Sequence, residues 1–206
     1  MLIKNLIRRS AAVLSAATMM ATLLAGTVFA ESETYEQPEL NPHSKSIIEA
    51  DGYQFIDLNG NGTLDVYEDW RQDAQTRAAD LVNQMTAREK IAQMQHPTYL
   101  PRADGKIAPY LEDYCTDYGI GMLLIRELNS VEAAATTMNT IQEYAEASRL
   151  GVPVLVSMDS VHGLSYVSGA TVTPHNLALA ATRDEELVTK LAEIARDEHL
   201  AVGVRM

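Results

Sequence analysis

The residues with the most specific spacing for chemistry lie in one stretch, 57–68. Oxygen-bearing residues recur there at the first, third, fifth, seventh and ninth positions, with a glutamate at the twelfth: Asp57, Asn59, Asn61, Thr63, Asp65 and Glu68. Ca²⁺ takes about six to eight hard oxygen ligands, and this is the spacing of an EF-hand calcium loop. In such a loop Thr63 would supply its backbone carbonyl, Gly62 would allow the sharp turn and Glu68 would bind with both oxygens.

We expect a structural Ca²⁺ site at this loop, because only one copy is present and no clear helix precedes Asp57. The alternative is an Asn/Gly-rich turn that binds no metal.

A second candidate is Asp159, which follows the apolar run 152–158. Such a run is typical of a strand buried on both faces of a parallel sheet. Ligands of α/β folds bind at the carboxyl ends of the strands, so Asp159 is a candidate binding residue. The alternative is that Asp159 only caps a turn and that His162 is structural. His96 has no neighbour at metal-ligand spacing, so we interpret it as a structural or surface histidine.

Apolar periodicity and capping motifs predict the elements that position these residues. We expect one helix over 73–85 and a second that begins at the capping box Thr86–Glu89. A third is expected over 130–149, and a fourth that begins at the capping box Thr182–Glu185 and ends at Gly203. We expect strands over 119–125, over 152–158 and from Val204, and a loop over 96–106. Alternating strands and helices indicate right-handed βαβ units and a parallel sheet.

The predicted fold class is therefore α/β. About 90 residues, 117–206, hold two βα units and the first residues of a third, whereas a closed (β/α)₈ barrel takes roughly 250 residues. We expect an incomplete barrel of this TIM type, preceded by the calcium loop and a helical segment, and we interpret the chain as the N-terminal piece of something larger.

The first 30 residues are typical of an export signal. Lys4, Arg8 and Arg9 precede an Ala-rich apolar segment that ends at Ala30, so we expect cleavage before Glu31 and an extracellular or periplasmic location. The alternative is an uncleaved membrane anchor. Residues 31–51 are polar and are predicted to be a flexible lead-in, and organised sequence begins at Gly52.

Charge and cysteine content exclude several classes of protein. The formal net charge of the 206-residue chain is −12, and it becomes −15 once the three cations of the signal are removed. Nucleic-acid binding needs clustered Lys and Arg, so we exclude nucleic acid as a partner. No stretch after the signal is apolar enough to span a membrane. Cys115 is the only cysteine, so the chain forms no internal disulfide.

A series of motifs in order resembles the start of a glycoside hydrolase family 3 β-glucosidase. Besides the loop 57–70, the motifs are Leu-Val-Asn-Gln-Met-Thr-Ala-Arg-Glu-Lys-Ile-Ala-Gln-Met (81–94), Gly-Ile-Gly-Met-Leu-Leu (119–124), Ser-Arg-Leu-Gly-Val-Pro (148–153), Asp-Ser-Val-His-Gly (159–163), Thr-Pro-His-Asn (173–176) and Leu-Ala-Ala-Thr-Arg-Asp (179–184). The resemblance covers 52–206. One departure is Thr173, where Phe is common in the family.

The resemblance implies a (β/α)₈-type barrel with a second α/β domain, and retaining hydrolysis of β-linked glucosides or oligosaccharides from the non-reducing end. Retention needs two carboxyl groups roughly 5 Å apart. The family's nucleophile and acid/base would lie beyond residue 206, so we expect the chain by itself to be inactive. The resemblance makes Asp159 an acceptor of hydrogen bonds from the sugar hydroxyls, and His162 a residue that shapes the loop.

Two other classes of function are weighed against this one. The first is a non-enzymatic extracellular calcium-binding interaction module of the dockerin type, which would be expected to repeat the loop. The second is an α/β enzyme that binds phosphate or a nicotinamide cofactor, but no Gly-rich phosphate loop follows either predicted strand. The motifs fit β-glucosidase, β-xylosidase and exo-glucanase equally.

Overall fold

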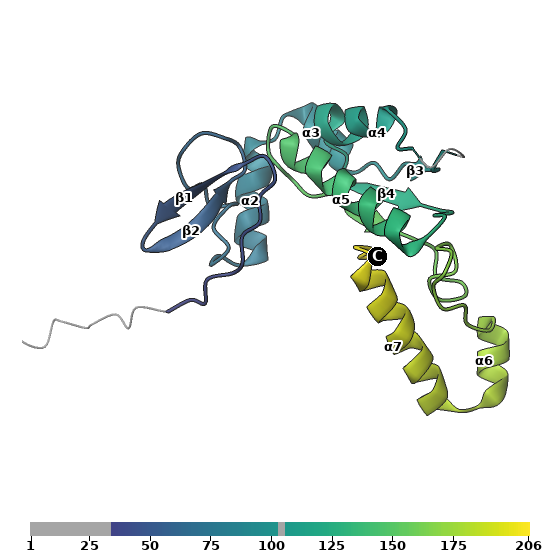
Figure 1. Cartoon of the computed structure of the whole chain (residues 1–206). Helices are drawn as coiled ribbons and strands as arrows, with labels where there is room; N and C mark the ends of the chain where they lie inside the picture. Colours follow the sequence, from purple (N-terminus) through teal and green to yellow (C-terminus); the bar gives the residue numbers. More distant parts are fainter. Residues whose placement is uncertain (1–33, 103–105) are drawn as a thin grey trace, which may run out of the picture. The chain divides into compact units, whose positions relative to one another are not determined.

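The structure is a computed structural model that describes residues 34–102 and 106–206 (Figure 1). The predicted signal, 1–30, lies outside the described residues. The chain divides into two compact units, Met1–Glu36 and Gln37–Met206, and the fold described below is that of the second. Within the described residues, no helix is both long and apolar enough to cross a membrane.

The second unit begins with an antiparallel hairpin of β1 (Ser46–Ala50) and β2 (Tyr53–Asp57). Its turn is the pair Asp51-Gly52, with φ of 53° and 82°, which is the turn chemistry that two-residue hairpins prefer. The prediction of a flexible lead-in over 31–51 is wrong for β1. The sequence before β1 is also held, because the Glu146 carboxylate accepts hydrogen bonds from the backbone N–H groups of residues 43–45.

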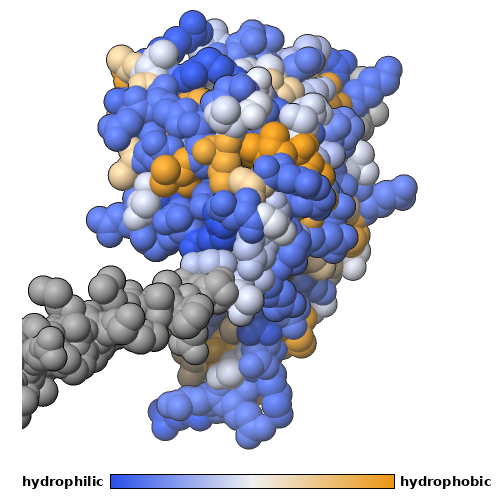
Figure 2. Space-filling view, turned by 90° about the vertical axis from the view of Figure 1, so that its left-hand side faces the viewer, coloured by the Kyte–Doolittle hydropathy of each residue, from blue (hydrophilic) through white to orange (hydrophobic). Residues whose placement is uncertain are grey.

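Two helices follow the loop 57–68, close to the predicted positions. In α2 (Ala74–Gln84) the Asp73 side chain caps the first turn, and α3 (Ala87–Gln93) begins with the predicted capping box of Thr86 and Glu89. Their apolar faces are less covered than a packing helix requires. Val82 is 47% exposed, Ile91 57% and Met94 73%. Figure 2 shows one face of the molecule, on which patches of hydrophobic residues interrupt a largely hydrophilic surface.

A parallel sheet is formed by β3 (Thr98–Tyr99), β4 (Met122–Ile125) and β5 (Leu155–Ser157), in that order. The prediction that 96–106 is a loop is therefore wrong at β3. The strand is only two residues long and is flanked by prolines, so it shows no periodicity. Beyond β5, the Arg205 N–H donates to the Val156 carbonyl and the Met158 N–H to the Met206 carbonyl. The segment predicted to begin the next strand thus lies alongside β5.

The helices between the strands are α4 (Tyr110–Glu112), which continues into the π-helical η1 (Asp113–Tyr118), and α5 (Val131–Ala147). Ser130, the first residue of the predicted helix 130–149, caps α5 with its side chain. The inner face of α5 packs on β4 and β5 in the main core; the buried side chains there include Leu123, Ile125, Met138, Ile141 and Val156.

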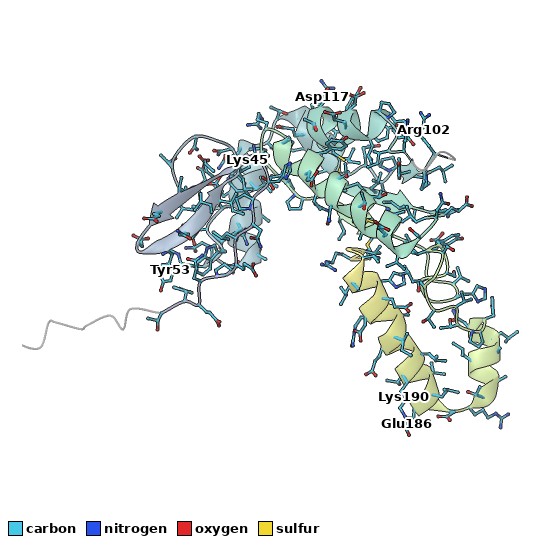
Figure 3. All side chains as sticks on the ribbon, viewed as in Figure 1. Lys45, Tyr53, Arg102, Asp117, Glu186 and Lys190 are labelled. Atoms are coloured by element: carbon cyan, nitrogen blue, oxygen red, sulfur yellow. The ribbon has the colours of Figure 1, made fainter. Side chains whose placement is uncertain are left out.

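After β5 come α6 (Asn176–Thr182) and α7 (Glu185–Ala201). The prediction that Thr182 caps the last helix, in a capping box with Glu185, is wrong. Thr182 is the last residue of α6, Arg183 turns the chain with φ of 54°, and Asp184 caps α7. The predicted end at Gly203 fits, because Gly203 follows α7 with φ of 89°. No residue of α7 is buried; Figure 3 shows Glu186 and Lys190 on this helix, where they form an ion pair one turn apart.

Candidate functional site

Asp159 lies two residues beyond β5, at its carboxyl end, as predicted. Its neighbour across the sheet is Arg126, which directly follows β4. The register pairs Leu124 of β4 with Ser157 of β5, so the two strands end side by side. One Nη2–H of Arg126 donates to Oδ2 of Asp159 over 2.7 Å, and each side chain is 41% exposed. The strand ends therefore present an ion pair that solvent and a ligand can reach.

Arg126 was missed by the sequence reasoning. The available signal was a single charged residue after an apolar strand, but its pairing with Asp159 depends on the register of β4 against β5. That register is a long-range feature of the fold, and neither strand specifies it alone.

The loop after Asp159 is held in shape by backbone contacts. The Thr173 N–H donates to the His162 carbonyl over 3.0 Å, and His162 Nδ1 lies 3.1 Å from the Thr173 carbonyl. Gly163 has φ of 69°, and a Cβ there would lie 2.9 Å from the Thr171 carbonyl. These contacts agree with the interpretation that His162 shapes the loop.

His96 precedes β3, the strand at the opposite edge of the sheet from β5. Its Nε2 is 2.7 Å from Oγ of Ser157, the buried last residue of β5, while His96 itself is exposed. A contact of this kind joins the segment before β3 to β5, across β4. It agrees with the structural interpretation of His96.

The loop 57–68 folds around two inward-facing carboxylates. Asp57 accepts hydrogen bonds from the backbone N–H groups of Asn61 and Gly62, over 3.1 and 2.9 Å. Glu68 accepts three, from the N–H groups of Leu58, Asn59 and Asp65. Gly62 has φ of 77°, a conformation that residues with a side chain rarely adopt. The loop is therefore closed by its own hydrogen bonds, with Gly62 in the left-handed conformation that a sharp turn needs.

The remaining predicted metal ligands meet at Asp65. Its Oδ2 accepts hydrogen bonds from the side-chain amides of Asn59 and Asn61, over 2.6 and 2.7 Å. Thr63 bonds instead to Oδ1 of Asn61. In the parts of the chain that the structure describes, no three His, Cys, Asp or Glu side chains are gathered as a ligand set. The loop brings the six predicted residues together, but as a hydrogen-bonded network in which two amide nitrogens face Asp65.

The charges of this loop are nevertheless suited to a cation. Asp57 is 3% exposed and Glu68 4%. Burial raises the pKa of Glu68 above its ordinary value, although its hydrogen bonds from backbone N–H groups act in the opposite direction. Within residues 34–102 and 106–206, the ion pairs found join other carboxylates. Buried carboxylates are costly without a partner charge, and a hard divalent cation such as Ca²⁺ would offset the charge of Asp57 and Glu68.

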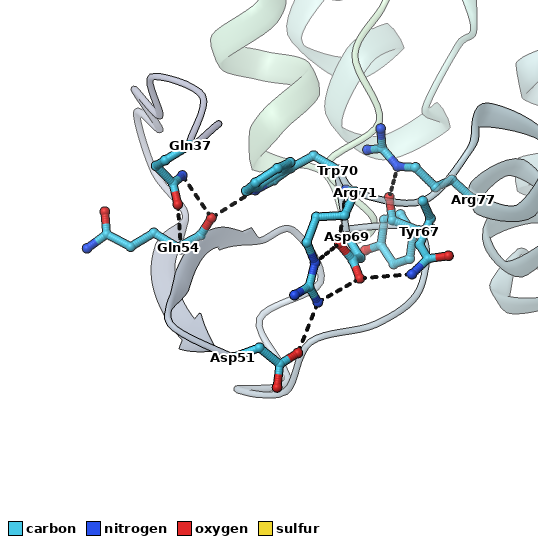
Figure 4. Close-up of polar contacts among 9 residues, drawn as sticks. Gln37, Asp51, Gln54, Tyr67, Asp69, Trp70, Arg71 and Arg77 are labelled. Carbon is cyan, nitrogen blue, oxygen red and sulfur yellow. Dashed lines mark hydrogen bonds and ion pairs between the residues drawn. The ribbon is translucent and has the colours of Figure 1, made fainter. Parts of the chain in front are cut away.

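The residues after the loop anchor it to the hairpin (Figure 4). Arg71 contacts both oxygens of Asp69, at 2.8 and 2.9 Å, and reaches Asp51 at 3.1 Å. Its guanidinium also lies 4.9 Å from the centre of the Phe55 ring, on which Trp70 stacks. The Arg71 guanidinium holds the pKa of Asp69 below its usual value. These contacts tie the residues after the loop to the turn and to β2 of the hairpin.

Comparison with known proteins relates the chain to one family. The model of the glycosyl hydrolase family 3 N-terminal domain matches residues 86–206. The periplasmic beta-glucosidase/beta-xylosidase of Dickeya chrysanthemi is 36% identical over 185 residues, which are 82% of this chain and 28% of that protein. Beta-glucosidase C of Emericella nidulans is 32% identical over 69% of this chain and 25% of its own length.

A solved structure is similar as well. The glycoside hydrolase family 3 beta-N-acetylglucosaminidase from Paenibacillus sp. str. FPU-7 superposes with a TM-score of 0.54 and 26% identity, covering 59% of this chain and 23% of that one. The chain thus spans about a quarter of the length of these relatives.

Proposed function

This chain belongs to glycosyl hydrolase family 3, and we propose that it forms the N-terminal part of an exported, retaining β-glucosidase-type enzyme that acts on non-reducing-end β-glucosides. The family model covers more than half of the chain, and the two sequence relatives named above carry beta-glucosidase in their names, the first together with beta-xylosidase. Within this proposal the described residues supply the first strands of an incomplete (β/α)₈ barrel.

The observation that carries the proposal is the position of Asp159 at the carboxyl end of β5, half exposed and paired with Arg126. An ionised carboxylate accepts charge-assisted hydrogen bonds from hydroxyl groups, which are the donors that a sugar offers in number. We propose that Asp159 binds hydroxyls of the non-reducing-end sugar.

Retaining hydrolysis also needs a nucleophile and an acid/base whose carboxyl groups are roughly 5 Å apart. We assign neither role to a residue of this chain and propose that both come from the remainder of the barrel and the domain after it. The 206-residue chain alone is then inactive.

The test is hydrolysis of an aryl β-glucoside by the complete product of the gene and by the 206-residue chain. We expect turnover by the complete product only. Asp159→Asn should lower kcat/KM by at least roughly 100-fold, because two hydrogen bonds to a charged group, each worth about 1.5–3 kcal/mol, together amount to at least about 3 kcal/mol. The matched control is Asp197→Asn, which alters an exposed aspartate paired with Arg196. Reproducible turnover by the 206-residue chain, or no turnover by the complete product, would overturn the proposal.

We also propose that the loop 57–68 binds a structural Ca²⁺ through Asp57, Asn59, Asn61, Thr63, Asp65 and Glu68. Support comes from the buried carboxylates and from the closed loop described above. Ca²⁺ binding would require the amides of Asn59 and Asn61 to turn their oxygens toward the ion.

Calorimetric titration of the chelator-treated chain with Ca²⁺ tests this. We expect stoichiometric binding that Glu68→Gln weakens at least tenfold and that Glu49→Gln, in exposed β1, leaves unchanged. The absence of binding heat with the folded chain would remove Ca²⁺ from the proposal. Ca²⁺ binding together with no glycosidase turnover by the complete product would instead favour a non-enzymatic calcium-binding interaction module.

The proposal of export is tested by sequencing the N-terminus of the mature protein. We expect Glu31 as its first residue, and the periplasmic relative supports this location. Retention of the first 30 residues would contradict it.

A further inference from the structure

The turn that carries Arg126 is fixed to the loop that carries Asp159. Directly after Arg126, Glu127 adopts φ of 60°, one of only three non-glycine residues with positive φ in the described part of the chain. The next residue, Leu128, donates its N–H to the Tyr166 carbonyl over 2.7 Å and accepts from the Ser168 N–H over 3.0 Å. Unusual backbone conformations persist where the surroundings over-determine them, and they cluster at functional sites.

Part of the Arg126 side chain is buried, although an ion pair at the surface does not require this. Its Nε is buried and has no hydrogen-bond partner within the described residues, although the side chain as a whole is 41% exposed. An unpaired buried donor is unfavourable, and a half-exposed ion pair adds little to folding stability. Stability alone therefore gives a poor account of why the arginine is held in this orientation.

We propose that Arg126 is the positioning residue of the sugar-binding carboxylate. It holds Oδ2 of Asp159 at 2.7 Å and leaves Oδ1 directed to the sugar hydroxyls. The inference rests on the proposed function, because it assigns a role to Arg126 through Asp159. A lysine would keep the charge, but it lacks the planar group that fixes both distance and direction.

The ion pair itself is tested without sugar, by NMR of arginine side chains in the 206-residue chain. We expect a slowly exchanging Nη–H signal, assigned to Arg126 by its loss in Arg126→Lys, that collapses in Asp159→Asn. The signal should persist in Asp197→Asn. An Arg126 signal that is unaffected by Asp159→Asn overturns the inference and leaves the proposed function untouched.

The role in binding is tested by a double-mutant cycle in the complete gene product, with an aryl β-glucoside as substrate. Arg126→Gln and Arg126→Lys should each lower kcat/KM about tenfold, within the range of coupling between contacting residues. In an Asp159→Asn background the same changes should have almost no further effect. A merely structural arginine would produce losses that multiply with that of Asp159→Asn.

The matched control is Arg196→Gln, because Arg196 forms an ion pair of the same 2.7 Å length with Asp197 on exposed α7. It should leave kcat/KM unchanged. Losses from Arg126→Gln that persist in the Asp159→Asn background overturn the inference. If Asp159→Asn itself has no effect, the proposed function fails, and the inference fails with it.

Discussion

Glu89 links the start of α3 to the residues after α5, and its replacement should destabilise the chain in a pH-dependent way. Its carboxylate accepts the Thr86 N–H over 2.8 Å in the capping box, and it receives Nε and Nη2 of Arg149 over 2.8 and 2.6 Å. The hydrogen bonds from Arg149 are the main reason that the pKa of Glu89 is lowered to about 2.

The magnitude of the Glu89→Gln effect follows from these contacts. The lowered pKa corresponds to at most about 3 kcal/mol. Arg149 is 53% exposed, so solvent screening reduces the contribution of the pair to roughly 1 kcal/mol. Weakening of the capping box adds about 0.5 kcal/mol. We expect the free energy of unfolding at pH 7 to fall by roughly 1–2 kcal/mol.

The pH dependence of the stability difference tests whether the ionised Glu89 carboxylate is its cause. A carboxylate whose pKa is depressed in the folded state contributes stability above its unfolded pKa, and that contribution is lost as pH falls through the folded pKa. The ordinary value is 4.5 and the folded value is about 2. The difference between wild type and Glu89→Gln should therefore be complete above pH 5 and shrink by more than half by pH 3, because at that pH Glu89 is protonated in the unfolded chain and still ionised in the folded one.

The assay is urea unfolding of the 206-residue chain at pH 7, 5, 4 and 3. Glu186→Gln serves as the control, because Glu186 pairs with Lys190 while 79% exposed and should cost little at any pH. A Glu89→Gln effect below about 0.3 kcal/mol at pH 7, or one that stays constant down to pH 3, would refute the reasoning.

Two further predictions concern the core. Leu123→Ala, at a fully buried position of β4, should lower the free energy of unfolding by about 2–5 kcal/mol in urea titrations. Leu155→Ala is the control and should lower it much less, because Leu155 is 38% exposed in β5. Equal losses for the two variants would contradict the packing described for the core. Cys115 is 1% exposed and burial raises the pKa of its thiol to about 12, so a thiol reagent at pH 8 should modify it only after unfolding in urea. Rapid modification of the folded chain would show that the site opens.

Features set by local chemistry could be predicted from the sequence. Asp73 and Ser130 cap their helices, and Thr86 with Glu89 forms a capping box, because each interaction joins residues within one turn. The turn at Gly62 in the loop 57–68 is also local, whereas the hydrogen bonds from Leu58 and Asn59 to Glu68 join residues ten and nine positions apart. At the end of α6, two polar residues could cap the next helix, and the left-handed conformation of Arg183 leaves Asp184 as the cap.

Features that depend on long-range pairing could not be predicted. β3 is a strand only because it hydrogen-bonds to β4, and Arg126 matters only because β4 and β5 end together. Ile91 and Met94 lie three residues apart on one apolar face, yet the described residues leave both exposed. Periodicity identifies the face of a helix that would be buried and says nothing of the element that covers it.

The most direct test of the central claim is a crystal structure of the complete gene product with bound glucose. We expect that an oxygen of Asp159 accepts a hydrogen bond of about 2.5–3.0 Å from a sugar hydroxyl while the other oxygen remains bonded to Arg126. Glucose bound away from the carboxyl ends of β4 and β5, or with no contact to Asp159, would contradict it.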